Sequence, residues 1–257
     1  MLHYFPDPYK NETLYSVLAR FQYYSANPSM EQTLRDLFDD PTVSSSLFIP
    51  TKLNTLVQKL PPNKEYSLEN LVYNHTLYPL SHSFFDEASK EKFWLDLSSQ
   101  KRPYSNTSVQ GQELMYCPVC AKMDYENHGE AFFRREHQIK GFTFCCDHYC
   151  ELLHYPISRN VISGRSYIRF DYDLIHQDSN NSILDFQFEK NLLNIGHSIK
   201  YLLNNQISQN DWNNKIQYHL WLIGLTTING SIKQFELSVA FKEFYTEKNI
   251  RLSGFEF

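Results

Sequence analysis

Cysteine is absent from most of this 257-residue chain. All five cysteines lie between Cys117 and Cys150, and the other 223 residues contain none. Thiols that merely fill a core would not cluster in this way. The sequence does not start with a charged-then-apolar secretory leader, so disulfides are a poor explanation. The cluster therefore favours metal binding.

Long apolar runs and glycine are also scarce. No stretch approaches the ~20 apolar residues that a membrane span needs. Glycine occurs only 8 times, and no glycine-rich phosphate loop, nuclease-like acidic cluster or nucleophile motif is present. We therefore expect a soluble, cytoplasmic protein with no membrane partner. An enzyme, such as a nuclease or a thiol oxidoreductase, is disfavoured.

The chain also lacks the positive charge typical of a nucleic-acid binder, because its net charge is −5. The balance is uneven, however. Residues 101–170 contain nine Lys and Arg against seven Asp and Glu, so this segment carries +2 and the remainder carries −7. A locally basic surface can bind DNA through a few phosphate contacts. Charge alone still argues against DNA binding.

Helical periodicity dominates the residues before the cysteines, and the 18 Tyr and 19 Phe supply much of the core. Residues 12–21 repeat apolar side chains at the spacing of one helix face. Ser29 and Gln32 form a capping pattern before a second helix, and Asn27 and Pro28 make a turn between the two. The pair resembles a helix-turn-helix, although helical hairpins occur in every fold. Further helices are predicted at 52–60, 67–75, 85–97, 188–203 and 211–222.

The C-terminal region offers a second helix-turn-helix candidate. Asn229–Gly230 separates the helix at 211–222 from a following run that Ser231 caps. Ser231, Lys233 and Gln234 then stand at the start of a recognition helix and are candidate DNA contacts. A helical hairpin that only packs on its neighbour explains the pattern equally well.

The cysteine segment contains two matched metal-binding pairs. Cys117 and Cys120 are separated by two residues, and so are Cys145 and His148. Three thiolates and one imidazole make a closed tetrahedral set for one structural Zn²⁺, with no open position for catalysis. A thioredoxin-like redox pair is disfavoured because no βαβ pattern surrounds it. Cys146, Cys150 and the histidines at 128, 137 and 154 are expected to have no metal role.

Between the two pairs, the sequence predicts a zinc ribbon. Residues 131–138 read as a strand, residues 140–141 as a turn and residues 142–144 as the returning strand, with a short helix through Leu152 and Leu153 after the second pair. Arg134, Arg135 and Lys140 are the candidate DNA contacts of this segment. On a strand, Arg134 and Arg135 would lie on opposite faces. Arg135 could equally pair with a local carboxylate and brace the ribbon.

The predicted fold class is mainly α with a small zinc-ribbon β insertion. Helical, helix-turn-helix-like domains flank a Cys3His zinc finger. The predicted boundaries are 1–110 for the N-terminal helical domain, 111–165 for the zinc ribbon and 166–257 for the C-terminal helical domain.

Several of these motifs, in this order and spacing, resemble the TniQ/TnsD family over roughly residues 3 to 157. Asn74–Leu80 is closer to the TnsD branch than to the shortest TniQ proteins. The motifs are Phe5-Pro6-Asp7-Pro8, the run from Asn11 to Ser16, Ala19-Arg20, Tyr116-Cys117-Pro118-x-Cys120, Gly129-Glu130-Ala131-Phe132, Arg134-Arg135-x-His137-Gln138 and Cys145-x-x-His148.

The resemblance implies a non-catalytic transposon target selector. TnsD-type members recognise an attachment site in double-stranded DNA and recruit the AAA+ ATPase TnsC, which brings the transposase. Other TniQ members dock on CRISPR effector complexes. In this chain the zinc ligands would be Cys117, Cys120, Cys145 and His148, and the protein would be associated with the bacterial nucleoid. The alternative is a protein adaptor that links a CRISPR effector complex to the transposition machinery without reading DNA itself.

Overall fold

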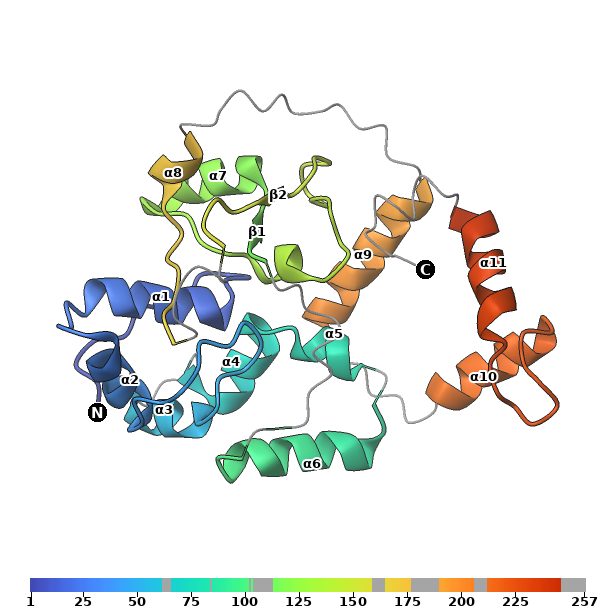
Figure 1. Cartoon of the computed structure of the whole chain (residues 1–257), viewed down its shortest axis with the longest axis horizontal. Coiled ribbons are helices and arrows are strands. Elements are labelled where there is room, and N and C mark those ends of the chain that lie inside the picture. Colours follow the sequence, from blue (N-terminus) through green and yellow to red (C-terminus); the bar gives the residue numbers. More distant parts are fainter. Residues whose placement is uncertain are drawn as a thin grey trace.

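The computed structural model describes residues 1–61, 66–83, 85–101, 103, 113–158, 165–176, 190–205 and 212–245. This part is mainly helical, as the sequence predicted, with one small two-stranded antiparallel sheet (Figure 1). No helix in these ranges has both the length and the apolar character to cross a membrane. The elements are α1 (Leu14–Tyr24), α2 (Met30–Phe38), α3 (Leu53–Lys59), α4 (Leu68–His75), α5 (Tyr78–His82), α6 (Glu87–Ser98), β1 (Met115–Tyr116), α7 (Pro118–His128), the 3₁₀ helix η3 (Arg135–Gln138), β2 (Leu153–His154), α8 (Tyr172–His176), α9 (Lys190–Asn204), α10 (Trp212–Leu222) and α11 (Gln234–Tyr245).

The first two helices begin at side-chain caps. The Thr13 hydroxyl accepts a hydrogen bond from the Ser16 amide at the start of α1, and the Ser29 hydroxyl accepts one from the Gln32 amide at the start of α2. Such caps satisfy amides that have no partner within the helix. The apolar face predicted for α1 is buried throughout. The N-terminal helix pair and its Ser29 cap are therefore confirmed.

One hydrophobic core joins the N-terminal helices to the cysteine segment and to α9. It runs from Phe5 through Phe133 and Phe144 to Leu203. Helix α9 lies against α5 and α4, although more than a hundred residues separate it from them in the sequence (Figure 1). This core therefore contains residues from all three predicted segments.

The N-terminal lead is hydrogen-bonded to the segment that follows α7. The Thr13 amide donates to the Phe133 carbonyl at 2.9 Å, and the Arg135 amide donates to the Asn11 carbonyl at 2.9 Å. Glu12 and Arg134 face each other across this antiparallel bridge. The residues before α1 therefore belong to the same structural unit as the cysteine segment.

The predicted ribbon hairpin between the two metal-binding pairs was wrong. Helix α7 occupies the first part of that interval, with Pro118 in its first turn and Gly129 at its C-terminal cap in the left-handed conformation (φ 75°). Residues 135–138 form η3 instead of continuing a strand. The side chain of Gln138 bonds both the amide and the carbonyl of Met115, at 3.1 and 2.8 Å, and so replaces a strand partner.

The helix predicted through Leu152 and Leu153 was also wrong. Leu153 lies in β2 and pairs with Tyr116 of β1. A hairpin-like turn instead surrounds the second pair, because Phe144 bridges Glu151 and the Leu152 amide donates to the Thr143 carbonyl at 2.8 Å. Strands β1 and β2 therefore lie before the first metal-binding pair and after the second, and not between the two pairs.

Gly196 allows α9 to approach the cysteine segment closely. A Cβ atom at this position would lie 2.3 Å from Cys146 Sγ and 3.2 Å from Phe142 Cζ. We expect Gly196→Ala to lower the free energy of unfolding by about 1–2 kcal/mol, because overpacking outweighs the helix propensity that alanine adds. Denaturant unfolding measures the change. The double variant Gly196→Ala/Cys146→Ala should recover most of the loss; no recovery would mean that α9 does not pack here.

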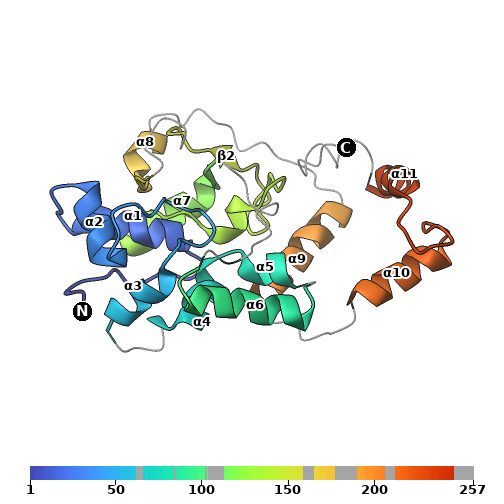
Figure 2. The same ribbon diagram turned by 60° about the horizontal axis from the view of Figure 1, so that its bottom comes forward.

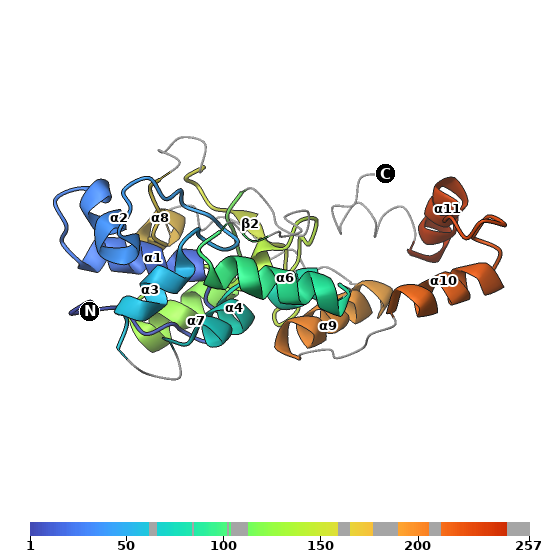
Figure 3. The same cartoon turned by 90° about the horizontal axis from the view of Figure 1, so that it is seen from below.

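Helices α10 and α11 lie at the end of the molecule remote from the N-terminus in all three views (Figures 1, 2 and 3). Residues 223–233 join them through a turn in which Thr226 bridges Ile232. Ser231 does not cap α11, contrary to the prediction, because the helix begins three residues later, at Gln234. Many large apolar side chains here are exposed, among them Trp221 (63%), Ile223 (67%) and Phe235 (77%).

Candidate metal centre

The four predicted zinc ligands come together at one point. One donor atom from each of Cys117, Cys120, Cys145 and His148 lies within 4.8 Å of all the others. His148 Nδ1 is 3.5 Å from Cys117 Sγ, 3.2 Å from Cys120 Sγ and 3.6 Å from Cys145 Sγ. Cys120 Sγ and Cys145 Sγ are 3.7 Å apart.

Local backbone structure holds both pairs in place. Cys117 is the N-cap residue of α7, and its sulfur accepts a hydrogen bond from the Cys120 amide at 3.4 Å. The second pair lies on a tight turn, in which the Tyr149 amide donates to the Cys145 carbonyl and the Cys145 amide donates to the Cys150 carbonyl. Tyr149 adopts a left-handed conformation (φ 50°) to complete this turn. Each pair is thus shaped without a contribution from the other.

The geometry fits a tetrahedral zinc ion. Ligand bonds of about 2.3 Å to sulfur and about 2.0 Å to nitrogen place neighbouring donors roughly 3.5–3.8 Å apart. The distances from His148 Nδ1 and between Cys120 and Cys145 cluster around that range. Hydrogen bonds from the Cys117 and Cys120 thiols lower the pKa of Cys145 and so favour its thiolate form. These residues could hold a metal ion.

The remaining cysteines and histidines lie outside this group of four. Cys150 is buried with its sulfur 3.4 Å from Cys117 Sγ. Cys146 packs toward Gly196 of α9. His137 Nε2 is 3.9 Å from Cys120 Sγ, and His128 stacks on Tyr9 with ring centres 4.4 Å apart. The contact between Cys150 and Cys117 could not be predicted from the sequence spacing.

A buried cluster of charges ties α1 to the cysteine segment. Arg20 donates to Glu12 at 3.0 Å and to Glu130 at 2.8 Å, and all three side chains are at most 10% exposed. Burial raises the pKa of Glu12 to about 7, against the opposing effect of Arg20. Tyr9 and Tyr24 also donate hydrogen bonds to Glu130. Arg20 thus connects the N-terminal lead to the end of α7.

Comparison with known proteins matches this same unit. The TniQ family model covers residues 3–152, which is more than half of the chain. The chain belongs to the TniQ family. It is also 27% identical over 152 residues to the Transposon Tn7 transposition protein TnsD from Escherichia coli, a match that covers 56% of this chain and 30% of TnsD. The aligned region therefore spans about a third of the length of that curated relative.

In this TniQ protein, the two arginines predicted to contact DNA are held by contacts within the fold. Arg134 donates to Asp124 through Nε at 3.0 Å and Nη2 at 2.6 Å, and its side chain is 20% exposed. Arg135 is only 2% exposed. The first arginine braces η3 against α7, and the second lies beside α4 and α9.

The other predicted DNA contacts are more accessible. Lys140, Ser231 and Gln234 are exposed, and Lys233 is half-buried. The Lys233 amine donates to the Gly224 carbonyl at 3.0 Å, at the end of α10. Lys140 lies in the cysteine segment, whereas the other three lie at the distant α10–α11 end (Figure 3). The fold does not gather the predicted DNA contacts into one patch.

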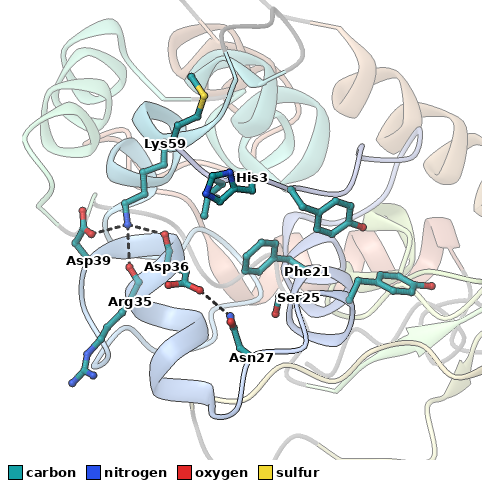
Figure 4. A pocket seen from close by; sticks show the side chains of 12 residues that line it. His3, Phe21, Ser25, Asn27, Arg35, Asp36, Asp39 and Lys59 are labelled. Atoms are coloured by element: carbon teal, nitrogen blue, oxygen red, sulfur yellow. Dashed lines mark hydrogen bonds and ion pairs between the residues drawn. The ribbon is translucent and has the colours of Figure 1, made fainter.

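A cavity of about 520 Å³ lies beside the N-terminal helix pair (Figure 4). Phe21 and His3 line it, together with polar side chains from α2 and the turn before it. The Asn27 side chain donates to Asp36 at 3.0 Å, and the Lys59 amine bonds Asp39 at 2.7 Å. The first bond ties the turn after α1 to α2, and the second ties the end of α2 to α3.

Proposed function

We propose that this protein is a zinc-containing, non-catalytic target selector in transposition that contacts duplex DNA and recruits a TnsC-type AAA+ ATPase. The observation that carries the proposal is the TniQ match over residues 3–152, which includes all four members of the Cys3His group. The similarity to the Tn7 protein TnsD supports a role in transposition.

One structural zinc ion is part of the proposal. When bound, zinc cross-links the start of α7 to the turn at residues 145–148, and four protein ligands leave no position for a substrate. Cys117, Cys120, Cys145 and His148 would hold it. The arrangement supports a folding role and offers no basis for catalysis.

Direct DNA contact is proposed for Lys140, Ser231, Lys233 and Gln234. Lysine would neutralise phosphates, and Ser231 and Gln234 could reach base edges or sugars. Arg134 and Arg135 would act indirectly, because the first is held by Asp124 and the second is buried. The N-terminal helix pair is the second candidate for entry into a groove.

The exposed apolar side chains of α10 and α11 support contact with a protein partner. Clusters of large exposed apolar residues mark interaction surfaces in soluble proteins. We propose that the segments 1–110, 111–165 and 166–257 differ in role: the first two form the zinc-organised unit, and the third adds α9 to it and presents α10 and α11.

Binding of fluorescent duplex DNA by the zinc-loaded chain across a salt series tests DNA contact. We expect affinity to fall steadily as salt rises, because bound lysines displace counterions. Lys140→Ala and Lys233→Ala should each weaken binding and reduce the salt slope by about one. Lys92→Ala, an exposed site on α6, is the control and should change neither. Absence of binding at low salt, or equal effects of all three variants, would refute direct DNA contact.

A further inference from the structure

A polar recess of about 370 Å³ lies where the N-terminal lead, α4, η3 and α9 meet. The recess is separate from the Cys3His group, because none of the four metal-binding candidates lines it. The residues that matter for its chemistry are Lys10, Asn11, Asn74, His75, Arg135 and Asn204. No acidic side chain is among the described residues that line it.

Arg135 is a buried cation with neutral partners. Its Nη1 donates to the Tyr73 carbonyl at 2.6 Å and its Nη2 to Asn204 Oδ1 at 2.9 Å. Nη2 also donates to Asn11 Oδ1 at 3.5 Å. Nε is buried without a hydrogen-bond partner, and none of the ion pairs among the described residues includes Arg135. Burial lowers the pKa of Arg135, which is the cost of holding this charge away from water.

The other walls add positive charge and amide groups. Lys10 is exposed in the lead. His75 is held through Nδ1, which lies 2.8 Å from the Glu12 carbonyl, and burial lowers its pKa to about 4, so the ring is neutral near pH 7. Lys10 and Arg135 are the two cationic side chains that line the recess.

We propose that this recess binds a phosphate group, either as a free ion or as a backbone phosphodiester of DNA. Arg135 lines the recess, and a guanidinium is suited to hydrogen-bond the oxygens of an oxyanion. Two cations attract both a phosphate dianion and the singly charged phosphodiester of DNA, and asparagine amides can donate to the remaining oxygens. The free-ion form stands without the proposed function, whereas the DNA form rests on it.

Calorimetric titration of the zinc-loaded chain with sodium phosphate, at constant ionic strength, tests the proposal. We expect phosphate and sulfate to bind and acetate to bind at least tenfold more weakly. Arg135→Gln should weaken phosphate binding at least tenfold and Lys10→Gln severalfold. Lys92→Gln, the control on α6, should leave it unchanged. Lys10 is exposed, so its variant decides the matter even if Arg135→Gln fails to fold.

Several outcomes would overturn the proposal. The first is that phosphate titration produces no heat of binding, and the second is that wild type and Lys10→Gln bind phosphate equally well. The third is that acetate binds as tightly as phosphate, which would indicate a carboxylate-bearing protein partner instead. Competition by a short duplex identifies the bound group as a DNA phosphate, and phosphate binding without competition identifies a free ion. Failure here would leave the salt-dependent DNA binding described above unaffected, so the two proposals fail separately.

Discussion

Cys120→Ser is expected to remove zinc from the chain and to unfold the segment around α7. Zinc would join the first turn of α7 directly to the turn at residues 145–148 through all four donors. Structural zinc contributes about 10–16 kcal/mol of apparent binding energy in small zinc-finger domains. A loss of even half of that would exceed what most single substitutions cause. Elemental analysis should show zinc falling from about one ion per chain to almost none, with a Tm at least roughly 10 °C lower.

Cys146→Ser is the matched control for this experiment. Cys146 is the neighbour of Cys145 in the sequence, but it packs toward α9 and stands outside the group of four. We expect it to keep its zinc and most of its stability. A zinc-free Cys120→Ser variant with an unchanged Tm, or equal loss of zinc from both variants, would contradict the proposed structural role.

Arg20→Met should be the most destabilising substitution outside the metal centre. It leaves Glu12 and Glu130 buried close to each other without their shared cation. Removing one partner of a buried ion pair costs about 3–5 kcal/mol. The loss should be greater at pH 8 than at pH 5. In the wild type burial raises the pKa of Glu12 to about 7 although Arg20 lowers it, so removal of Arg20 should raise that pKa further. A carboxyl with a raised pKa loses stability as the pH rises from its unfolded to its folded pKa, so the variant should go on losing stability above pH 7, where this loss levels off in the wild type. Denaturant unfolding at the two pH values measures both effects.

Two further variants make this result specific. Arg35→Met changes an exposed arginine on α2 and should alter the free energy of unfolding by no more than about 0.5 kcal/mol. The double variant Arg20→Met/Glu12→Gln removes one of the stranded charges and should recover part of the loss, most clearly at pH 8. Equal stability of Arg20→Met and wild type would show that the buried cluster does not join α1 to the cysteine segment.

Local signals in the sequence were sufficient to predict the N-terminal helices and the four candidate metal donors. Ser29 and Gln32 marked a helix start that the structure confirms, and two x-x spacings selected the four donors that meet in space. Helix α7 was missed because the interval between the two metal-binding pairs was interpreted as a zinc ribbon. The combination of Pro118 and Gly129 could have revealed it, since proline favours the first turn of a helix and glycine its C-terminal cap.

Long-range contacts could not be predicted in the same way. Arg20 and Glu130 are 110 residues apart, and nothing in the local pattern around either one indicates their pairing. Arg135 was expected on a strand surface, but the backbone pairing of residues 133–135 with the N-terminal lead places it in the interior. Burial of this kind depends on which segments meet. Side-chain type alone therefore could not separate arginines that face solvent from arginines that brace the fold.

Selection of bound sequences from a random duplex library by the zinc-loaded chain tests the central claim most directly. If the protein selects targets by reading DNA, successive rounds should enrich a common sequence. Addition of a zinc chelator before binding should abolish that enrichment. Recovery of random sequences alone, from a chain that carries its zinc and is fully folded, would contradict the claim that this chain chooses a DNA site.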